Sequence, residues 1–494
     1  MKLFGRNISI GNGAATNSIL LMFVSVVTTV ISLAITKLLS VYFSLQEYGT
    51  YSQAILVSTT TASLTLLGLS SAINYFYNRT PDVKEKQRYV SSIFFLEEII
   101  GTVVAVVLFI FRGEIVKYFK NEDVKNLIII VAFMPLLTNM IAMYQNLFVS
   151  IGRAKTIAIR NLVVSICRFI SVLVACFITR DVKTILIVLL ILDILQFLYF
   201  FLVFRRYSFD VSPKYLSPTT FKSILNFSIP LSIYTIAGSL ANDIDKYVIG
   251  YFTNTDTLAI YTNASKRLPF DIITSSFITV LIPIITRLLN DNKNEEANKL
   301  FSLYMRFGCI ISLICGGGCI ALSNHIIVLL YDEKYISGLP IFVIYLVIEM
   351  IRFANVTIVL SATGQTKIMM ISSISMLFLN AIFNVLSYKV FGWYGPAIVT
   401  LVLTIFTTLI LLHFAAKTLN THIIKLFDIK EMLIVSGEVI AFGMGFSFIY
   451  NKLCLTIYIP QICTLVVLAL FGVSLGIINY KKIQNYIHKI NSYK

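Results

Sequence analysis

Positively charged side chains lie deep inside long apolar stretches of this sequence, where a charge is costly unless it faces a water-filled cavity or an opposite charge. The cations placed in this way are Lys37, Arg168, Lys246, Lys266, Arg267 and Arg352, together with Arg306, which lies close enough to the cytoplasmic end of its helix to snorkel there. Cations held away from bulk water are suited to binding phosphate, and arginine can do so through two parallel hydrogen bonds. The pattern therefore indicates a binding site for an anionic group inside a membrane.

Acidic side chains in the same stretches support a competing interpretation, in which the charges pair only to hold helices together. The embedded acids include Glu97, Glu98, Asp193, Asp243, Asp245, Asp271, Glu349 and Glu438. Glu349 and Arg352 are spaced to pair on one helical face, and Asp243 or Asp245 could bridge to the cations of residues 266–267. Asp193, Asp243, Asp245, Asp271 and Glu349 are also candidates for lining a cavity or coupling an ion. Both interpretations stay open for single residues, but pairing alone gives no reason to bury so many charges.

Uncharged residues add weaker signals. Asn242, Tyr261 and Asn263 are candidate polar groups of the cavity, and Pro230 is a candidate hinge or a plain kink in its helix. Residues 316–318 are all glycine but lack the Lys-Ser/Thr of a phosphate loop, so they predict close helix contact or a bend. The seven cysteines form no CxxC pair, and no nucleotide motif, catalytic constellation or metal-ligand spacing emerges. We expect no catalytic residue and no bound metal.

The elements that carry these residues are long apolar helices. Hydrophobic residues make up 57% of the 494 residues and charged residues only 13%, with a mean hydropathy of +0.85, whereas soluble domains carry about 25% charged residues. The sequence predicts an all-α polytopic membrane protein of about fourteen transmembrane helices. Their predicted ranges are 17–43, 46–77, 89–111, 124–150, 157–179, 184–205, 221–251, 256–288, 299–323, 339–361, 365–388, 394–416, 430–450 and 458–480.

Loop charges predict the orientation. Most Lys and Arg of the loops fall on one side, which places both termini in the cytoplasm. This bias also explains the net charge of +16 without nucleic acid as a partner. The first apolar run lacks a cleavage site and is expected to be a retained helix.

A weak internal repeat predicts two lobes. Residues 41–54 and 251–264 align at a constant offset, with Tyr51 matching Tyr261 and Ala54 matching Ala264. Helices that are six apart in the sequence cross the membrane in the same direction. The two lobes would therefore be related by a rotation axis along the membrane normal. The predicted divisions are an N-terminal lobe at 1–205, a cytoplasmic linker at 206–220, a C-terminal lobe at 221–416, and two further helices with a cytoplasmic tail at 417–494.

Four local patterns carry a family resemblance. They are Glu47-Tyr48-Gly49-Thr50-Tyr51; Phe227-Ser228-Ile229-Pro230-Leu231 followed by Asn242-Asp243-Ile244-Asp245-Lys246; Tyr261-Thr262-Asn263-Ala264-Ser265-Lys266 with Pro283; and Gly392-Trp393-Tyr394-Gly395-Pro396-Ala397. In this order the chain resembles the polysaccharide-lipid flippases of the multidrug/oligosaccharidyl-lipid/polysaccharide exporter superfamily. The resemblance implies two six-helix lobes around a central cavity, plus two C-terminal helices.

The resemblance also implies a function. We expect a flippase in the bacterial cytoplasmic (inner) membrane that carries polyprenyl diphosphate-linked glycan, such as O-antigen (lipopolysaccharide) or capsule repeat units, to the outer leaflet. Alternating access through a cationic cavity would move this cargo, with Na+ or H+ as a possible coupling ion and no other cofactor. Membrane lipids, a polysaccharide polymerase and chain-length proteins are the expected partners. The alternatives are a cation-coupled multidrug exporter and a membrane glycan polymerase or transferase.

Overall fold

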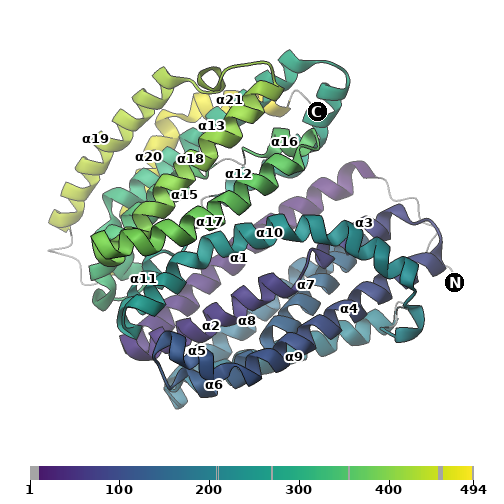
Figure 1. The fold of residues 1–494 in the computed structure, drawn as a ribbon. Helices are drawn as coiled ribbons and strands as arrows, with labels where there is room; N and C mark the ends of the chain where they lie inside the picture. The colour runs from purple at the N-terminus through teal and green to yellow at the C-terminus, as the bar shows by residue number, and fades with distance from the viewer. Residues whose placement is uncertain are drawn as a thin grey trace. The chain divides into compact units, whose positions relative to one another are not determined.

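The protein is helical throughout the part of the chain that the structure describes. The computed structural model describes residues 10–206, 209, 211–268, 271–353, 356–453 and 460–491, and leaves the side chains of 10–22, 271–280, 451–453, 460–462 and 491 outside the description. All regular elements in these ranges are α-helices or short 3-10 helices (Figure 1). The predicted all-α class is therefore confirmed.

The chain packs as two compact units, residues 1–43 with 53–236 and residues 44–52 with 237–494. The boundaries fall inside α2 and α10, so each of these two helices belongs partly to each unit. The predicted linker, 206–220, contains η1, whose Tyr215 hydroxyl accepts a hydrogen bond of 2.9 Å from Gln87 Nε2 of the first unit. The predicted lobe divisions stay a prediction.

Unit 1 is built around α4, α7 and α9, where Tyr144 stacks on Phe200 and lies edge-on to Phe204. Its elements are α1 (Ile10–Tyr42), most of α2 (Leu45–Thr65), α3 (Leu69–Arg79), α4 (Val83–Ile110), α5 (Arg112–Phe119), α6 (Val124–Val131), α7 (Met134–Ser150), α8 (Ala154–Ile178), α9 (Val182–Arg206), η1 (Pro213–Tyr215) and the first half of α10 (Pro218–Phe252).

Unit 2 is built around α13, which packs against α12, α15, α19, α20 and α21. Its further elements are the start of α2, the second half of α10, α11 (Thr255–Ala264), α12 (Asp271–Asn290), α13 (Asn294–Ala321), α14 (Ser323–Leu330), η2 (Glu333–Gly338), α15 (Leu339–Ile351), α16 (Ile358–Ala362), α17 (Thr366–Phe391), η3 (Gly392–Tyr394), α18 (Gly395–Thr418), η4 (Ile423–Leu426), α19 (Ile429–Leu453), α20 (Pro460–Ile478) and α21 (Tyr480–Asn491).

Glycines on α13 explain how three helices approach it closely. A Cβ atom at Gly316 would overlap Met350 of α15, one at Gly317 would overlap Val439 of α19, and one at Gly318 would overlap Phe471 of α20. The prediction that this run permits close helix contact is confirmed.

Many of the helices are long and apolar enough to cross a membrane. Within the described residues there are 11 such helical stretches, or up to 12 if a bent pair counts as one crossing. One stretch, 366–418, joins α17 and α18, which have 26 and 24 residues and are each longer than the roughly 20 residues that one crossing needs. The chain is therefore a multi-pass membrane protein, and the count of about fourteen stays a prediction.

Several predicted helices are broken rather than straight. The predicted helix 46–77 divides into α2 and α3 at Leu67 and Gly68, which both have positive φ angles. The predicted helix 256–288 divides after α11, and the predicted helix 339–361 divides where α15 ends at Ile351. These breaks decide where the charged residues lie, because two of the embedded arginines follow directly after them.

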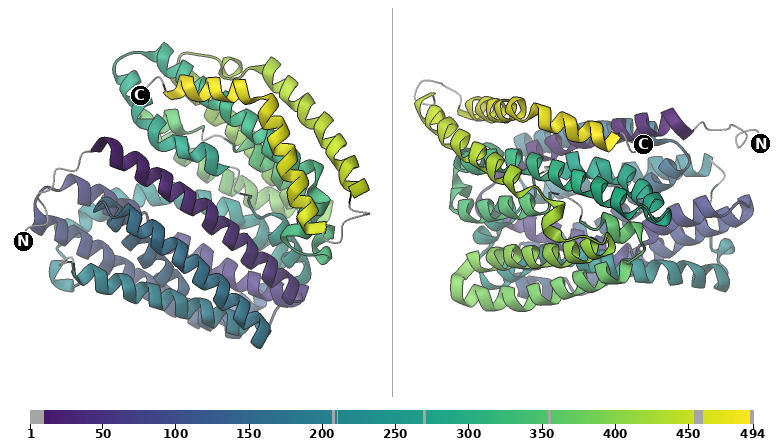
Figure 2. Two further views of the ribbon diagram at one scale, coloured as in Figure 1. Left: turned by 180° about the vertical axis from the view of Figure 1, so that it is seen from behind. Right: turned by 90° about the horizontal axis from the view of Figure 1, so that it is seen from above.

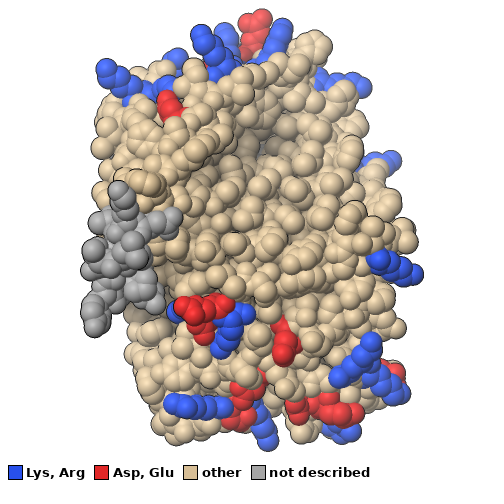
Figure 3. Space-filling view, turned by 90° about the vertical axis from the view of Figure 1, so that its left-hand side faces the viewer, with Lys and Arg blue, Asp and Glu red and all other residues tan. Residues whose placement is uncertain are grey.

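On one face of the molecule, charged side chains lie mainly toward the two ends. On the face in Figure 3, the upper end carries mainly Lys and Arg, the lower end carries both signs, and a broad zone between them is mostly uncharged. Figure 2 shows the long helices from two further sides, with α21 turning away from α20 near the C-terminus. An uncharged zone between charged ends is what a bilayer requires.

Candidate binding site within the membrane

Two arginines converge on one amide oxygen in unit 2. Arg267 Nη2 donates to Asn242 Oδ1 at 2.5 Å, and Arg352 Nη1 donates to the same oxygen at 3.4 Å. The two guanidinium groups thus lie within about 6 Å, where two unit charges repel by roughly 3 kcal/mol at an effective dielectric constant of about 20. An anion placed between them would remove this repulsion.

Both arginines lie at breaks in their helices. Arg267 lies between α11 and α12, and Arg352 caps the C-terminal end of α15, where its cation complements the helix dipole. Non-helical backbone at membrane depth is tolerated where it is buried in protein or lines a water-filled cavity. Arg352 is also fixed by a 3.2 Å hydrogen bond from Nη2 to Thr404 Oγ1, so both of its acceptors are neutral.

Glu349 is the acidic member of this cluster. Its Oε1 lies 3.4 Å from Arg267 Nε, and its side chain is 6% exposed against 48% for Arg267. The sequence suggested a pair between Glu349 and Arg352 on one helix, and the ion pair that the structure shows for Glu349 is with Arg267, from the break between α11 and α12. We call Asn242, Arg267, Glu349 and Arg352 the arginine cluster.

A buried carboxylate lies next along α10. Asp245 is 1% exposed and accepts hydrogen bonds from Tyr261 at 2.9 Å, from Tyr345, and from the backbone N–H of Lys246 at 2.8 Å. Lys246 Nζ forms an ion pair of 2.5 Å with Asp243 on the same helix. The two acids thus have partners on α10, α11 and α15, and a bridge from either of them to residues 266–267 stays a prediction.

The two copies of the sequence repeat touch each other. Tyr48, in the first copy, donates a 2.7 Å hydrogen bond to Asn263 Oδ1, in the second. A Cβ atom at Gly49 would overlap the Thr255 carbonyl, so the close approach requires glycine. Asn263 and Tyr261 are both buried inside unit 2.

Unit 1 holds a separate polar cavity of about 300 Å³. Arg168 of α8 forms an ion pair with Asp193 of α9, which also accepts a hydrogen bond of 3.1 Å from Gln196 Nε2. Arg160 donates to Gln196 Oε1 and, at 2.8 Å, to Asn161 Oδ1. Two arginines thus share the cavity with one carboxylate.

Arg160 is a residue that the sequence prediction missed, because it lies in the first turn of the predicted helix 157–179 and was counted with the cytoplasmic charges. Asn161, Ser165 and Arg168 also line this cavity, and their spacing places them on one face of α8. These polar residues on one face of the helix were the sequence signal from which the cavity could have been predicted. Glu97, one of the embedded acids named from the sequence, is buried and accepts a 2.8 Å hydrogen bond from Asn139 Nδ2.

The remaining predicted site residues are placed as follows. Lys37 on α1 and Lys266, beside Arg267, are half-buried, and the side chain of Asp271 lies outside the described residues. Pro230 lies exposed inside the continuous helix α10. Asn380 is fully buried and donates to Ala241 O at 3.2 Å, which favours helix packing as its role. The prediction that the cations of both halves share one cavity stays a prediction.

The chemistry available in these sites is anion binding. In the described residues, no group of three or more His, Cys, Asp or Glu side chains could hold a metal ion. The arginine cluster offers guanidinium groups whose other partners are mostly neutral, which suits phosphate oxygens.

Comparison with curated proteins shows a flippase relative. The chain is 22% identical over 305 residues to the probable lipid II flippase MurJ of Rickettsia prowazekii (strain Madrid E), covering 58% of this chain and 58% of that protein. The chain thus spans less than two thirds of that relative's length.

Solved structures show the same fold. The lipid II flippase MurJ in its inward closed conformation gives a TM-score of 0.73 at 18% identity, covering 94% of this chain and 99% of that chain. An inward-facing multidrug resistance MATE family transporter of the MOP superfamily gives 0.64 at 15% identity, covering 80% and 96%. At these identities the likeness establishes the fold alone.

A family comparison completes the assignment. Residues 38–336 match the family model described as "Polysaccharide biosynthesis protein", which is more than half of the chain. The protein therefore belongs to this polysaccharide biosynthesis family and has the fold of the multidrug/oligosaccharidyl-lipid/polysaccharide exporter superfamily, as its sequence predicted.

Proposed function

We propose that this protein is a flippase that moves glycan repeat units linked to polyprenyl diphosphate from the cytoplasmic to the outer leaflet of the bacterial cytoplasmic membrane. The observation that carries the proposal is the convergence of Arg267 and Arg352 on Asn242. A diphosphate would replace one neutral oxygen with several anionic ones, and each charge-assisted hydrogen bond is stronger than a neutral one. The family and the flippase relative agree with this cargo class.

Alternating access is the mechanism that this fold suggests. Two lobes, 1–205 and 221–416, would rock about the bound head group, and Pro230 is a candidate hinge. Lys37, Arg168 and Lys266 would add positive charge along the path. Both termini would face the cytoplasm, and a polymerase and chain-length proteins would receive O-antigen or capsule units outside.

Ion coupling would centre on Asp245. Its carboxylate is buried among two tyrosine hydroxyls and a backbone N–H. Protonation or Na+ binding would change the charge of a group held away from water, which biases a bistable transporter strongly.

A reconstituted flipping assay tests the cargo. Vesicles hold the purified protein and a fluorescent polyprenyl diphosphate-linked sugar, and an impermeant quencher reports the lipid in the outer leaflet. Arg267→Gln and Arg352→Gln should each slow flipping by about tenfold or more, since a hydrogen bond to a charged group is worth roughly 1.5–3 kcal/mol. Arg287→Gln, which changes an exposed arginine at the end of α12, is the matched control and should leave the rate unchanged.

The same vesicles separate the second candidate, a cation-coupled multidrug exporter, which the MATE-like fold favours. That function predicts transport of cationic dyes and no dependence on the arginines. Normal flipping in both arginine variants would contradict our proposal, and so would equal flipping of a sugar lipid without phosphate.

A further inference from the structure

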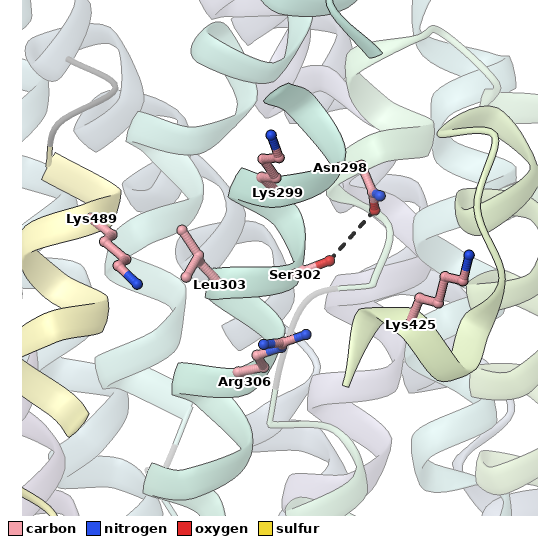
Figure 4. Close-up of a pocket in the computed structure, with 7 residues that line it drawn as sticks. All are labelled: Asn298, Lys299, Ser302, Leu303, Arg306, Lys425 and Lys489. Carbon is pink, nitrogen blue, oxygen red and sulfur yellow. Dashed lines mark hydrogen bonds between the residues drawn. The ribbon is translucent and has the colours of Figure 1, made fainter. Parts of the chain in front are cut away.

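A second cationic site lies in unit 2 and is formed by different elements from the arginine cluster. It is a pocket of about 470 Å³ (Figure 4). Its lining residues are Asn298, Lys299, Ser302, Leu303, Arg306, Lys425 and Lys489. Four of these seven side chains are cationic, so the pocket is built for a negative ligand.

Three elements that are distant in sequence build this pocket. The residues from 298 to 306 lie on one face of α13, Lys425 lies in η4, and Lys489 lies on α21. The helix α21 turns by 69° from α20 and so lies across the end of the bundle. Its apolar face, with the buried Tyr486 and Ile490, packs against the unit, which leaves Lys489 on the exposed face.

Two acids beside the pocket, Asp428 and Glu431, offset only part of its positive charge. Arg306 Nη1 lies 3.9 Å from Asp428 Oδ2, which is a long contact for an ion pair. The other oxygen of Asp428 accepts a 3.0 Å hydrogen bond from the backbone N–H of Glu431, at the start of α19. The Glu431 carboxylate accepts a hydrogen bond from Tyr486. Positive charge therefore exceeds negative charge at this site.

Two donors add to the cationic lining. The buried Arg306 Nε has no hydrogen-bond partner in the described residues. Ser302 Oγ donates a long 3.5 Å hydrogen bond to Asn298 Oδ1, and this hydroxyl can donate to a ligand oxygen instead (Figure 4). Such a mixture of cations, hydroxyl and amide suits phosphate oxygens.

The pocket is flanked by lipid-facing helices. Leu433, in the first turns of α19, is 69% exposed, and Ile477, at the end of α20, is 70% exposed. Exposed apolar side chains on membrane helices meet acyl chains. An amphipathic helix with a basic face, such as α21, belongs at the boundary between lipid and water. The loop charges predict that this end faces the cytoplasm.

We infer that this pocket binds the phosphate of an anionic phospholipid headgroup in the cytoplasmic leaflet. Basic pockets between helices on the cytoplasmic side are suited to such headgroups. Lys299, Arg306, Lys425 and Lys489 hold the phosphate, while the acyl chains lie along α19 and α20. The bound lipid fixes α21 against α13, and the inference does not depend on the cargo of the arginine cluster.

Native mass spectrometry of the full-length protein tests the inference. The protein is released from micelles doped with dioleoyl phosphatidylglycerol or dioleoyl phosphatidylcholine, and bound lipid is counted over a titration. The double variant Lys425→Gln/Lys489→Gln removes two exposed cations and should weaken phosphatidylglycerol binding by roughly 30-fold. The control Lys430→Gln/Lys481→Gln removes two exposed cations outside the lining and should change it by less than twofold.

Competition on the unchanged protein identifies the source of the phosphate. Inorganic phosphate and glycerol 3-phosphate at millimolar concentration should not displace phosphatidylglycerol, because they lack acyl chains. Displacement by either would overturn the lipid assignment. Equal weakening in the two double variants, or equal binding of phosphatidylcholine, would overturn the site itself.

Discussion

Removing the negative charge of Glu349 should tighten the binding of a diphosphate rather than weaken it. Glu349 Oε1 lies 3.4 Å from Arg267 Nε, so a phosphate on the far side of that guanidinium would lie roughly 7 Å from the carboxylate. Two unit charges at that distance repel by about 2 kcal/mol at an effective dielectric constant of about 20. Because the Arg267 side chain is 48% exposed, screening reduces this to about 1 kcal/mol.

We therefore expect Glu349→Gln to bind diphosphate about five- to tenfold more tightly and to release it more slowly. Isothermal titration calorimetry with pyrophosphate measures the affinity, and the vesicle assay measures the lower flipping rate. Glu438→Gln is the matched control, because that membrane carboxyl is hydrogen-bonded to Asn479 at 2.8 Å and lies outside the arginine cluster. The affinity of this control variant for pyrophosphate should be unchanged.

The opposite result has a clear meaning. If Glu349 only holds Arg267 in a structural pair, Glu349→Gln lowers the thermal stability of the protein and leaves pyrophosphate affinity unchanged or weaker. A folded Glu349→Gln protein with weaker binding would refute the idea that the arginine cluster holds an anion.

Three further predictions concern coupling, packing and topology. Asp245→Asn should abolish the dependence of flipping on a Na+ or H+ gradient while pyrophosphate still binds; a gradient response that survives would exclude Asp245 as the coupling group. Gly317→Ala should destabilise the protein by about 1–3 kcal/mol, because its Cβ overlaps Val439. Gly472→Ala, where a Cβ has open space, should be neutral or stabilising in the same heating assay. Reporter fusions after Lys494 and within 252–256 should report cytoplasm and outside respectively; a C-terminus outside would mean that a helix was miscounted.

The sequence alone determined the class of the protein. Long apolar runs with few charges leave helices as the only elements that satisfy their own backbone in lipid, so the helical membrane fold followed directly. The same logic identified Arg267 and Arg352 as unusual, because each lies within an apolar run. The local patterns around Tyr48, Pro230 and Tyr261 identified the superfamily, and Tyr48 and Asn263 do meet in unit 2.

Only the tertiary structure decided which charges meet. Helical spacing pointed from Glu349 to Arg352 on the same helix, but only the fold brings Arg267, from the break after α11, within 3.4 Å of Glu349. Arg160 was counted with the cytoplasmic charges at the end of its helix, because the cavity it lines depends on α9, which the local sequence of α8 does not specify. The sequence placed Lys489 in the predicted cytoplasmic tail. In the structure, α21 packs against α13, and Lys489 lines the same pocket as Arg306. Burial of an apolar face is read from local sequence, whereas a binding site is made where separate helices meet.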